Sequence, residues 1–347
     1  MGWLNKPLVD GEIRVSKHAN EFFHRRHNNQ GLRMQKDTAY EKPAGIRRIL
    51  LIGDSFFWGY GVNDKEVISE VLQNKFGKGV EALNGSVTGY GTDQELLWLT
   101  EEGLKYKPDI VVLGFFPYND IEEIAASIIY GYPKPFFNLE GGRLMLKNVP
   151  VPDTRETRRK GFEEPTTLWG RLKKFLRHNT HIYPFAASRL NSNKTLRQFF
   201  IDTGIAEEYT WDLPGVAFYK LSDKEKAMDL SDALLLELRK VSEGAGAKFL
   251  LVFIPRKESL AKSSGDNVTR GVREWNDNAR RYLKDFTSEH KLAFIDLLPV
   301  LRSYNERGVA LYHVKDYDNH WNAEGHRIAA EEIFNSLKQR GWLLAGE

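Results

Sequence analysis

Four short stretches of the sequence carry residue types that could together activate a serine. Ser55 follows a run of apolar residues and a glycine, and Asn119 follows a second apolar run. Gly89 lies in a glycine-rich loop, and His320 lies in a loop with aspartates close by. A serine becomes a nucleophile when a histidine accepts its proton, and amide N–H groups can stabilise the oxyanion that then develops. These residue types indicate nucleophilic acyl chemistry.

Each stretch also has an ordinary structural explanation when it is taken alone. Ser55 could cap the following helix with help from Asp54, and Asn119 could cap a helix or stabilise a turn. The glycines around Gly89 fit a simple turn, and Asn322 is expected to cap the last helix. Their common position at one edge of a predicted sheet is what favours a catalytic site.

The elements that position these residues are strands and helices in alternation. Short apolar runs predict five buried strands, at 48–53, 80–83, 109–115, 248–254 and 292–296. Helical patterns lie between and after them, near 65–76, 93–106, 224–242, 272–289 and 323–340. This alternation predicts an α/β fold with a central parallel sheet covered on both faces. Ligands of such sheets bind beyond the carboxyl ends of the strands.

The alternation stops between about residues 121 and 223, where proline, aromatic and charged residues are frequent. We expect 121–223 to be an insertion or cap between the third and fourth strands of a core formed by 46–120 and 224–342. Residues 1–45 are expected to be an N-terminal extension that packs on this core. Because the insertion starts directly after Asn119, it is expected to cover the edge of the sheet that carries the site.

In their order along the chain, Gly53-Asp54-Ser55, Gly89, Asn119 and His320 resemble the four sequence blocks of the SGNH hydrolases, the GDSL-like lipases and esterases. The stretches 27–33 and 318–326 also resemble bacterial members linked to polysaccharide or lipid acyl chemistry. The resemblance covers residues 27 to 120 and 225 to 340, approximately. It implies a flavodoxin-like three-layer α/β/α sandwich with a central parallel sheet and a large insertion.

The resemblance also implies a role for each matching residue. Ser55 would be the nucleophile, and His320 would be the general base and then the general acid. The oxyanion hole would consist of the backbone N–H groups of Ser55 and Gly89 and the side chain of Asn119.

The sequence departs from the family at the third member of the triad. The usual acid lies three residues before the histidine, where this chain has Tyr317. We assign the role to Asp318, which lies two positions before His320. Residues two apart in an extended loop point to the same side, so its carboxylate can lie beside the imidazole. Asp316 is the alternative.

These roles imply a serine esterase that hydrolyses a short acyl ester of a small molecule or carbohydrate, with no cofactor or metal. Acyl transfer to a sugar by the same residues is one alternative. A catalytically silent domain that binds glycan is another, disfavoured because no required residue type is missing. Spacing alone would also allow a metal site built from His313, Asp316, Asp318, His320 and His326.

Composition excludes further classes of protein. The chain has no cysteine, which excludes disulfides, zinc–thiolate sites and cysteine nucleophiles. Its net charge is only +3, which argues against a nucleic-acid binder. No run is apolar enough to span a bilayer, and the first residues lack the apolar core of a signal peptide. We expect a cytoplasmic protein if the chain is complete, and an extracytoplasmic one if a leader or anchor was removed.

Residues 154–178 combine many basic residues with an apolar helical face. The apolar positions are Leu168, Trp169, Leu172, Phe175 and Leu176. A helix of this kind could contact a membrane surface or an anionic glycan. The favoured interpretation is an amphipathic helix that covers the core with its basic face in water.

Overall fold

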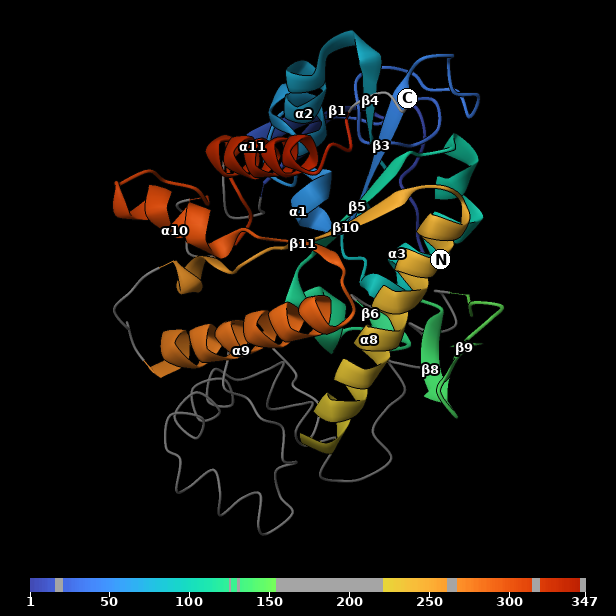
Figure 1. Cartoon of the computed structure of the whole chain (residues 1–347), viewed down its shortest axis with the longest axis vertical. Helices are drawn as coiled ribbons and strands as arrows, with labels where there is room; N and C mark the ends of the chain where they lie inside the picture. Colours follow the sequence, from blue (N-terminus) through green and yellow to red (C-terminus); the bar gives the residue numbers. More distant parts are fainter. Residues whose placement is uncertain are drawn as a thin grey trace, which may run out of the picture.

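The computed structural model describes residues 1–15, 21–124, 126–129, 132–153, 221–260, 267–313 and 319–343. Five parallel strands form the central sheet, in the order β11-β10-β5-β3-β4 (Figure 1). The strands are β3 (Arg47–Ile52), β4 (Val80–Asn84), β5 (Ile110–Phe115), β10 (Lys248–Phe253) and β11 (Ala293–Asp296). Each lies within one residue of the bounds expected from its apolar run.

The order of the strands creates a reversal beside the first strand of the sheet. Numbered along the chain, the sheet strands are arranged 2-1-3-4-5, which is the flavodoxin-like order. The chain leaves β3 toward β4 on one side and returns to β5 on the other. Ser55 follows β3 and Asn119 follows β5, so both lie beside this reversal, where open α/β sheets bind their ligands.

Helices cover both faces of the sheet, which confirms the expected three-layer sandwich. In Figure 1, α2 (Ile68–Phe76) and α11 (Ala323–Gln339) lie on one face. The other face carries α3 (Thr92–Glu101), α8 (Leu221–Gly244) and α9 (Asn267–Glu289). The helix α10 (Leu298–Glu306), which follows β11, was not expected from the sequence. Asn322 caps α11 as expected, accepting the Glu324 and Gly325 N–H groups.

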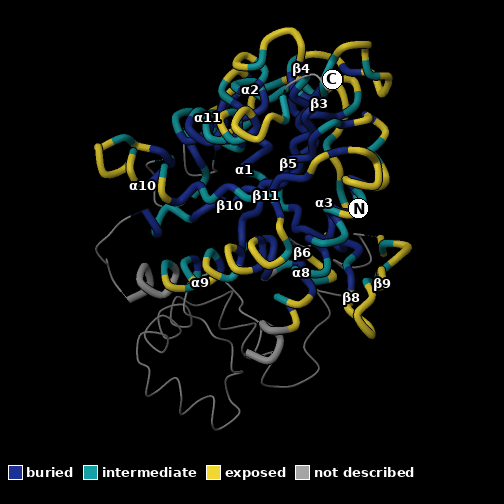
Figure 2. Tube along the Cα trace, in the orientation of Figure 1, coloured by how far each residue is buried: buried dark blue, intermediate teal, exposed yellow. Residues whose placement is uncertain are grey.

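Short helical segments connect these elements. They are α1 (Ser55–Trp58), the 3₁₀ segments η1 (Asp64–Glu66), η2 (Gly77–Gly79), η3 (Gly103–Tyr106) and η5 (Lys257–Ser259), and the π-helical turn η4 (Tyr118–Glu122). Figure 2 shows the central strands buried beneath the helices. All six residues of β5 are buried, as a strand in the middle of a doubly covered sheet requires.

Three two-stranded antiparallel sheets lie outside the central sheet. The first pairs β1 (Asp10–Arg14) with β2 (Phe22–Arg26), in the N-terminal part of the chain. The others pair β6 (Ile128–Ile129) with β7 (Tyr132–Pro133), and β8 (Phe136–Glu140) with β9 (Arg143–Lys147). The β8–β9 hairpin packs against α8.

Much of the expected insertion, including the basic stretch 154–178, lies outside the described residues. The division of the chain into extension, core and insertion therefore stays a prediction, as does the covering of the site by the insertion. Among the helices in the described ranges, none has the length and apolar character needed to cross a bilayer.

Candidate active site

Ser55 and His320 meet at the carboxyl edge of the sheet. His320 Nε2 lies 2.8 Å from Ser55 Oγ, although the two residues are 265 positions apart in sequence. A neutral imidazole nitrogen at this distance can accept the hydroxyl proton as the oxygen attacks. The structure thus brings together the two residues to which the sequence assigned nucleophile and base.

The start of α1 presents the Ser55 hydroxyl at the edge of the sheet. Asp54, not Ser55, is the helix cap, because its carboxylate accepts the Phe56 N–H at 2.8 Å. Ser55 is therefore the first residue of α1, and its side chain faces His320. Gly59 ends the helix in the left-handed region, with φ of 88°, and its N–H donates to the Ser55 carbonyl.

Asp54 also holds the side chain of Asn119. Its second carboxylate oxygen accepts from Asn119 Nδ2 at 2.7 Å, and both side chains are buried. Burial raises the pKa of Asp54 to about 6, against the opposing effects of the Phe56 N–H, His320 and Asn119. Asn119 thus has its amide anchored by a carboxylate directly beside Ser55.

Gly89 follows β4, so the three candidate oxyanion residues follow three adjacent strands, β4, β3 and β5. Its φ of 73° lies in the left-handed region that favours glycine. Within the described parts of the chain, the N–H groups of Gly89 and Ser55 have no hydrogen-bond acceptor. Both N–H groups could therefore donate hydrogen bonds to an oxyanion.

Two aromatic rings flank the imidazole of His320. The ring centroids of Phe56 and Tyr60 lie 5.1 Å and 4.9 Å from that of His320. The His320 carbonyl accepts the His313 N–H at 3.1 Å, next to an isolated bridge between Tyr312 and Trp321. These contacts fix both the backbone and the plane of the imidazole.

The third member of the triad stays a prediction. Both candidates, Asp318 and Asp316, lie outside the described residues. They also belonged to the alternative metal site, of which only the three histidines are described. His326 is completely buried, and burial lowers its pKa to about 3. In the described parts of the chain, no group of three or more histidines and carboxylates could hold a metal ion.

Buried carboxyl groups cluster behind Asn119. They are Asp93, Glu95, Asp120 and Glu123, with Lys134 as the cation that pairs with Asp93. Burial raises the pKa of Glu95 and of Asp120 well above the usual range, and raises that of Glu123 to about 7. Neighbouring carboxylates push in the same direction. Burial thus shifts Glu95, Asp120 and Glu123 toward the protonated state, whereas Asp93 is paired with Lys134.

Sequence reasoning missed two contributors to the site. Asp54 was considered only as an aid to a capping serine, although an Asp directly before a helix is itself a strong cap signal. Tyr60 carries no pattern that would have singled it out, because its contact with His320 depends on the fold.

The C-terminal part of the chain is similar to a known protein family. Residues 210–347 match the family model described as "SGNH hydrolase-like domain, acetyltransferase AlgX". No curated protein sequence matches the chain.

Solved structures with similar folds have low sequence identity. A catalytic mutant of an acetylxylan esterase from Geobacillus stearothermophilus is 13% identical, with 88% of this chain and 100% of that chain covered and a TM-score of 0.43. An aryl esterase from M. smegmatis is 12% identical, with 84% and 99% covered and a TM-score of 0.41. A carbohydrate acetylesterase from Sinorhizobium meliloti is 11% identical, with 85% and 99% covered and a TM-score of 0.41.

The family match agrees with the site and the sheet of the chain itself. The flavodoxin-like strand order places Ser55 at the topological reversal, and His320 comes from the loop before the last helix. That loop and helix lie within the matched residues. The part of the chain that carries His320 and the last helix is therefore similar to the SGNH hydrolase-like domain.

Proposed function

We propose that the protein is a serine esterase that forms an acyl-enzyme on Ser55. The observation that carries the proposal is the 2.8 Å contact between His320 Nε2 and Ser55 Oγ at the carboxyl edge of the sheet. A hydroxyl group is a weak nucleophile until an adjacent base accepts its proton, and this contact supplies the base.

The reaction follows from the placement of the groups. Ser55 Oγ attacks the ester carbonyl while His320 Nε2 takes the proton. The resulting oxyanion accepts hydrogen bonds from the Ser55 and Gly89 N–H groups and from Asn119 Nδ2. The C–O bond of the leaving alcohol then breaks, and His320 returns the proton to its oxygen. Water attacks the acyl-enzyme by the same steps and releases the carboxylic acid.

We assign the orientation of the imidazole to Asp318. The base must be neutral at Nε2, which requires the proton on Nδ1. A carboxylate that accepts from Nδ1–H fixes this tautomer and stabilises the imidazolium that forms during attack. Asp318 lies two positions before His320 and is the assignment that the sequence favours.

The substrate we propose is a short acyl ester, with a carbohydrate as the alcohol portion. The description of the matching family model names an acetyltransferase, which supports an acetyl group. Resemblance of residues 27–33 and 318–326 to bacterial proteins of polysaccharide or lipid acyl chemistry is compatible with the carbohydrate.

Acyl transfer to a sugar is the second candidate function, and the same family description favours it. The acyl-enzyme would be identical, and a sugar hydroxyl would replace water in the second half of the reaction. The two functions differ in the acceptor, not in the residues around Ser55.

A chromogenic acetate ester tests both candidates. The unaltered protein should release the chromophore, and S55A and H320Q should lose this activity. S303A, which alters an exposed serine of α10, is the matched control and should retain it. Acceleration by an added oligosaccharide, with an acetylated sugar as product, would identify a transferase. Full activity in S55A would rule out the proposed nucleophile.

A further inference from the structure

Tyr60 joins three parts of the molecule at the site. Its backbone N–H donates to the carbonyl of Ser55 at 3.0 Å. Its ring lies 4.9 Å from the imidazole of His320, centroid to centroid. Its hydroxyl donates to the carbonyl of Val15, at the end of β1, at 2.6 Å. Tyr60 therefore links the proposed nucleophile, through its backbone, and the proposed base, through its ring, to the N-terminal hairpin β1–β2.

A small apolar cluster holds Tyr60 against the hairpin. Val15, Phe23 and Trp58 are buried together in a cluster separate from the main core, and Tyr60 packs on them. The ring of Phe23 meets that of Tyr60 edge to face, with centroids 5.5 Å apart. Trp58 is the last residue of α1, so the same cluster also contacts the helix that begins with Ser55.

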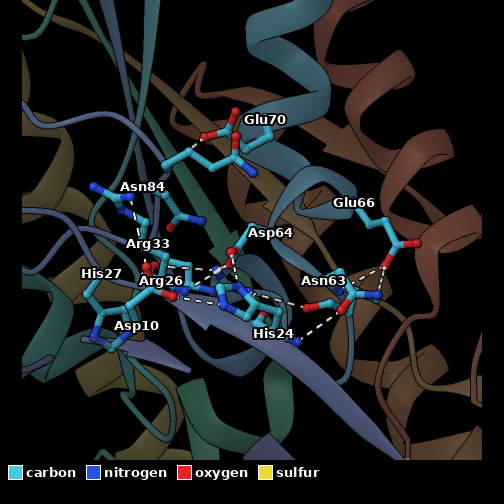
Figure 3. A network of polar contacts seen from close by, with 12 residues as sticks. Asp10, His24, Arg26, His27, Arg33, Asn63, Asp64, Glu66, Glu70 and Asn84 are labelled. Carbon is cyan, nitrogen blue, oxygen red and sulfur yellow. Dashed lines mark hydrogen bonds and ion pairs between the residues drawn. The ribbon is translucent and has the colours of Figure 1, made fainter. Parts of the chain in front are cut away.

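A polar network locks the hairpin to the segment that follows Tyr60 (Figure 3). Asp64 accepts from the Arg26 N–H at 2.9 Å, from the Arg33 guanidinium, and from His24 Nδ1 at 2.6 Å. The side chain of Asn63 accepts the His24 N–H at 2.9 Å. The backbone of β2 is thus bound to side chains only three and four positions beyond Tyr60.

Arg33 completes this attachment from inside the protein. Its side chain is fully buried, and it donates to the carbonyls of His24 and Val62 at 3.2 Å and 3.3 Å. It also lies 5.1 Å from the ring centroid of Trp58. Burying two opposite charges is costly, and the further hydrogen bonds of Asp64 and of the two terminal nitrogens of Arg33 offset part of that cost, while Arg33 Nε has no partner among the described residues.

His27 fixes the other side of Trp58. Burial lowers the pKa of His27 to about 4, so its ring is neutral at physiological pH. Nδ1 donates to the Lys6 carbonyl at 3.0 Å, and Nε2 accepts the indole N–H of Trp58 at 3.2 Å. Indole is a donor only, which determines this tautomer. The N-terminal part of the chain therefore forms hydrogen bonds with both ends of the segment 58–64.

We propose that Tyr60 is a positioning residue, through which the β1–β2 hairpin holds the imidazole of His320 in line with Ser55 Oγ. Its importance for turnover rests on the esterase function proposed above. The rings of Tyr60 and Phe56 both lie against the imidazole at a tilt, 45° and 43° from its plane, and rings in contact with it limit its rotation. A misplacement of a catalytic group by about 1 Å can cost on the order of 10²-fold in rate.

The experiment compares Y60F and Y60L with Y40F. Y60F removes the hydroxyl and with it the bond to Val15, whereas Y60L also removes the ring. Y40F is the matched control, because the Tyr40 hydroxyl bonds to Glu102 beside Tyr106, at the opposite end of β5 from the site. For Y60L we expect kcat to fall roughly 10- to 100-fold, while KM changes by less than about threefold. The kcat of Y60F should lie between those of Y60L and the unaltered protein, which separates the contribution of the hydroxyl from that of the ring.

Two further readouts separate positioning from a merely structural role. NMR of the histidine side chains should show a shifted and broadened His320 signal in Y60L, with thermal stability close to that of Y60F. Labelling of Ser55 by a phosphonate should slow in the same order as kcat. If Y60L matches Y40F in kcat and in its His320 signal, the inference is wrong. If the unaltered protein neither turns over ester nor labels at Ser55, the esterase proposal fails, and the His320 signal alone decides the inference.

Discussion

The side-chain amide of Asn119 donates to the carboxylate of Asp54 over 2.7 Å, and this bond joins the turn after β5 to the start of α1. The same carboxylate caps α1 through the Phe56 N–H. One buried side chain therefore fixes the helix that presents Ser55 and the amide proposed to face the oxyanion. The proposed nucleophile and one proposed oxyanion donor are held by a common group instead of by separate elements.

This arrangement makes Asn119 a donor whose loss should affect the chemical step. In N119A we expect kcat to fall by about 10²–10³, the usual effect of removing one oxyanion donor, while KM stays nearly constant. Steady-state kinetics on an acetate ester measures both values. N138A, which alters an exposed asparagine of β8, is the control. A change confined to KM would count against the assignment.

Ser55 should be the single site of covalent modification. A serine-directed phosphonate resembles the tetrahedral intermediate and needs both the activated hydroxyl and the oxyanion hole. We expect one adduct, on Ser55, by mass spectrometry of digested protein, and none in S55A. H320Q should label far more slowly, because its side chain cannot accept the hydroxyl proton in the same way. An adduct on a different serine would contradict the proposed mechanism.

Asp318 and Asp316 can be separated by two single substitutions. If Asp318 orients His320, D318N should lower kcat strongly, in the direction of the ~10⁴-fold loss known for the orienting aspartate of serine proteases, although by a smaller factor. D316N should have a much smaller effect. The measurement is kcat for both variants on one ester. A strong loss of kcat in D316N, with the kcat of D318N nearly unchanged, would assign the role to Asp316 instead.

Glu123 should make the protein less stable as the pH rises. Burial raises the pKa of its carboxyl from 4.5 to about 7, with Asp54 and Asp93 adding to the effect and Lys134 opposing it. The folded state therefore holds this proton more tightly than the unfolded state. Its contribution to stability is full below pH 4.5 and is lost as the pH rises through about 7.

The E123Q variant removes this dependence. At pH 8 we expect E123Q to be more stable than the unaltered protein by about 1–3 kcal/mol, since one pKa unit corresponds to about 1.4 kcal/mol. The difference should shrink at pH 5. Urea unfolding at both pH values measures it. E101Q, at an exposed position of α3, should show no such change with pH. An equal difference at both pH values would refute the explanation.

The sequence predicted the central sheet well because a strand buried on both faces is a continuous apolar run. Ser55 and His320 could be paired before the fold was known, because Ser55 follows a predicted strand, His320 precedes the last predicted helix, and both motifs resemble those of one family. The helix α10 was missed because its apolar residues continue those of β11 almost without a break, in Leu297, Leu298 and Val300.

Contacts between distant residues were beyond prediction. The hairpin β1–β2 has little apolar alternation of its own, and the buried Arg33–Asp64 pair that attaches it spans 31 positions. The bond between Asp54 and Asn119 spans 65. Local propensity and periodicity do not report such partners, because the energy of each contact exists only once both segments are in place.

The pairing of β5 with β10 has a consequence for synthesis on the ribosome. β5 pairs with β3, which precedes it, and with β10, which begins only at Lys248, so about 130 residues must be translated after Phe115 before its second neighbour exists. At roughly 5–20 residues per second, one edge of this wholly apolar strand stays open for about 7–26 s. An open strand of this composition readily pairs with other chains. Until β10 is made, the open edge of β5 should therefore be exposed to pairing with other chains.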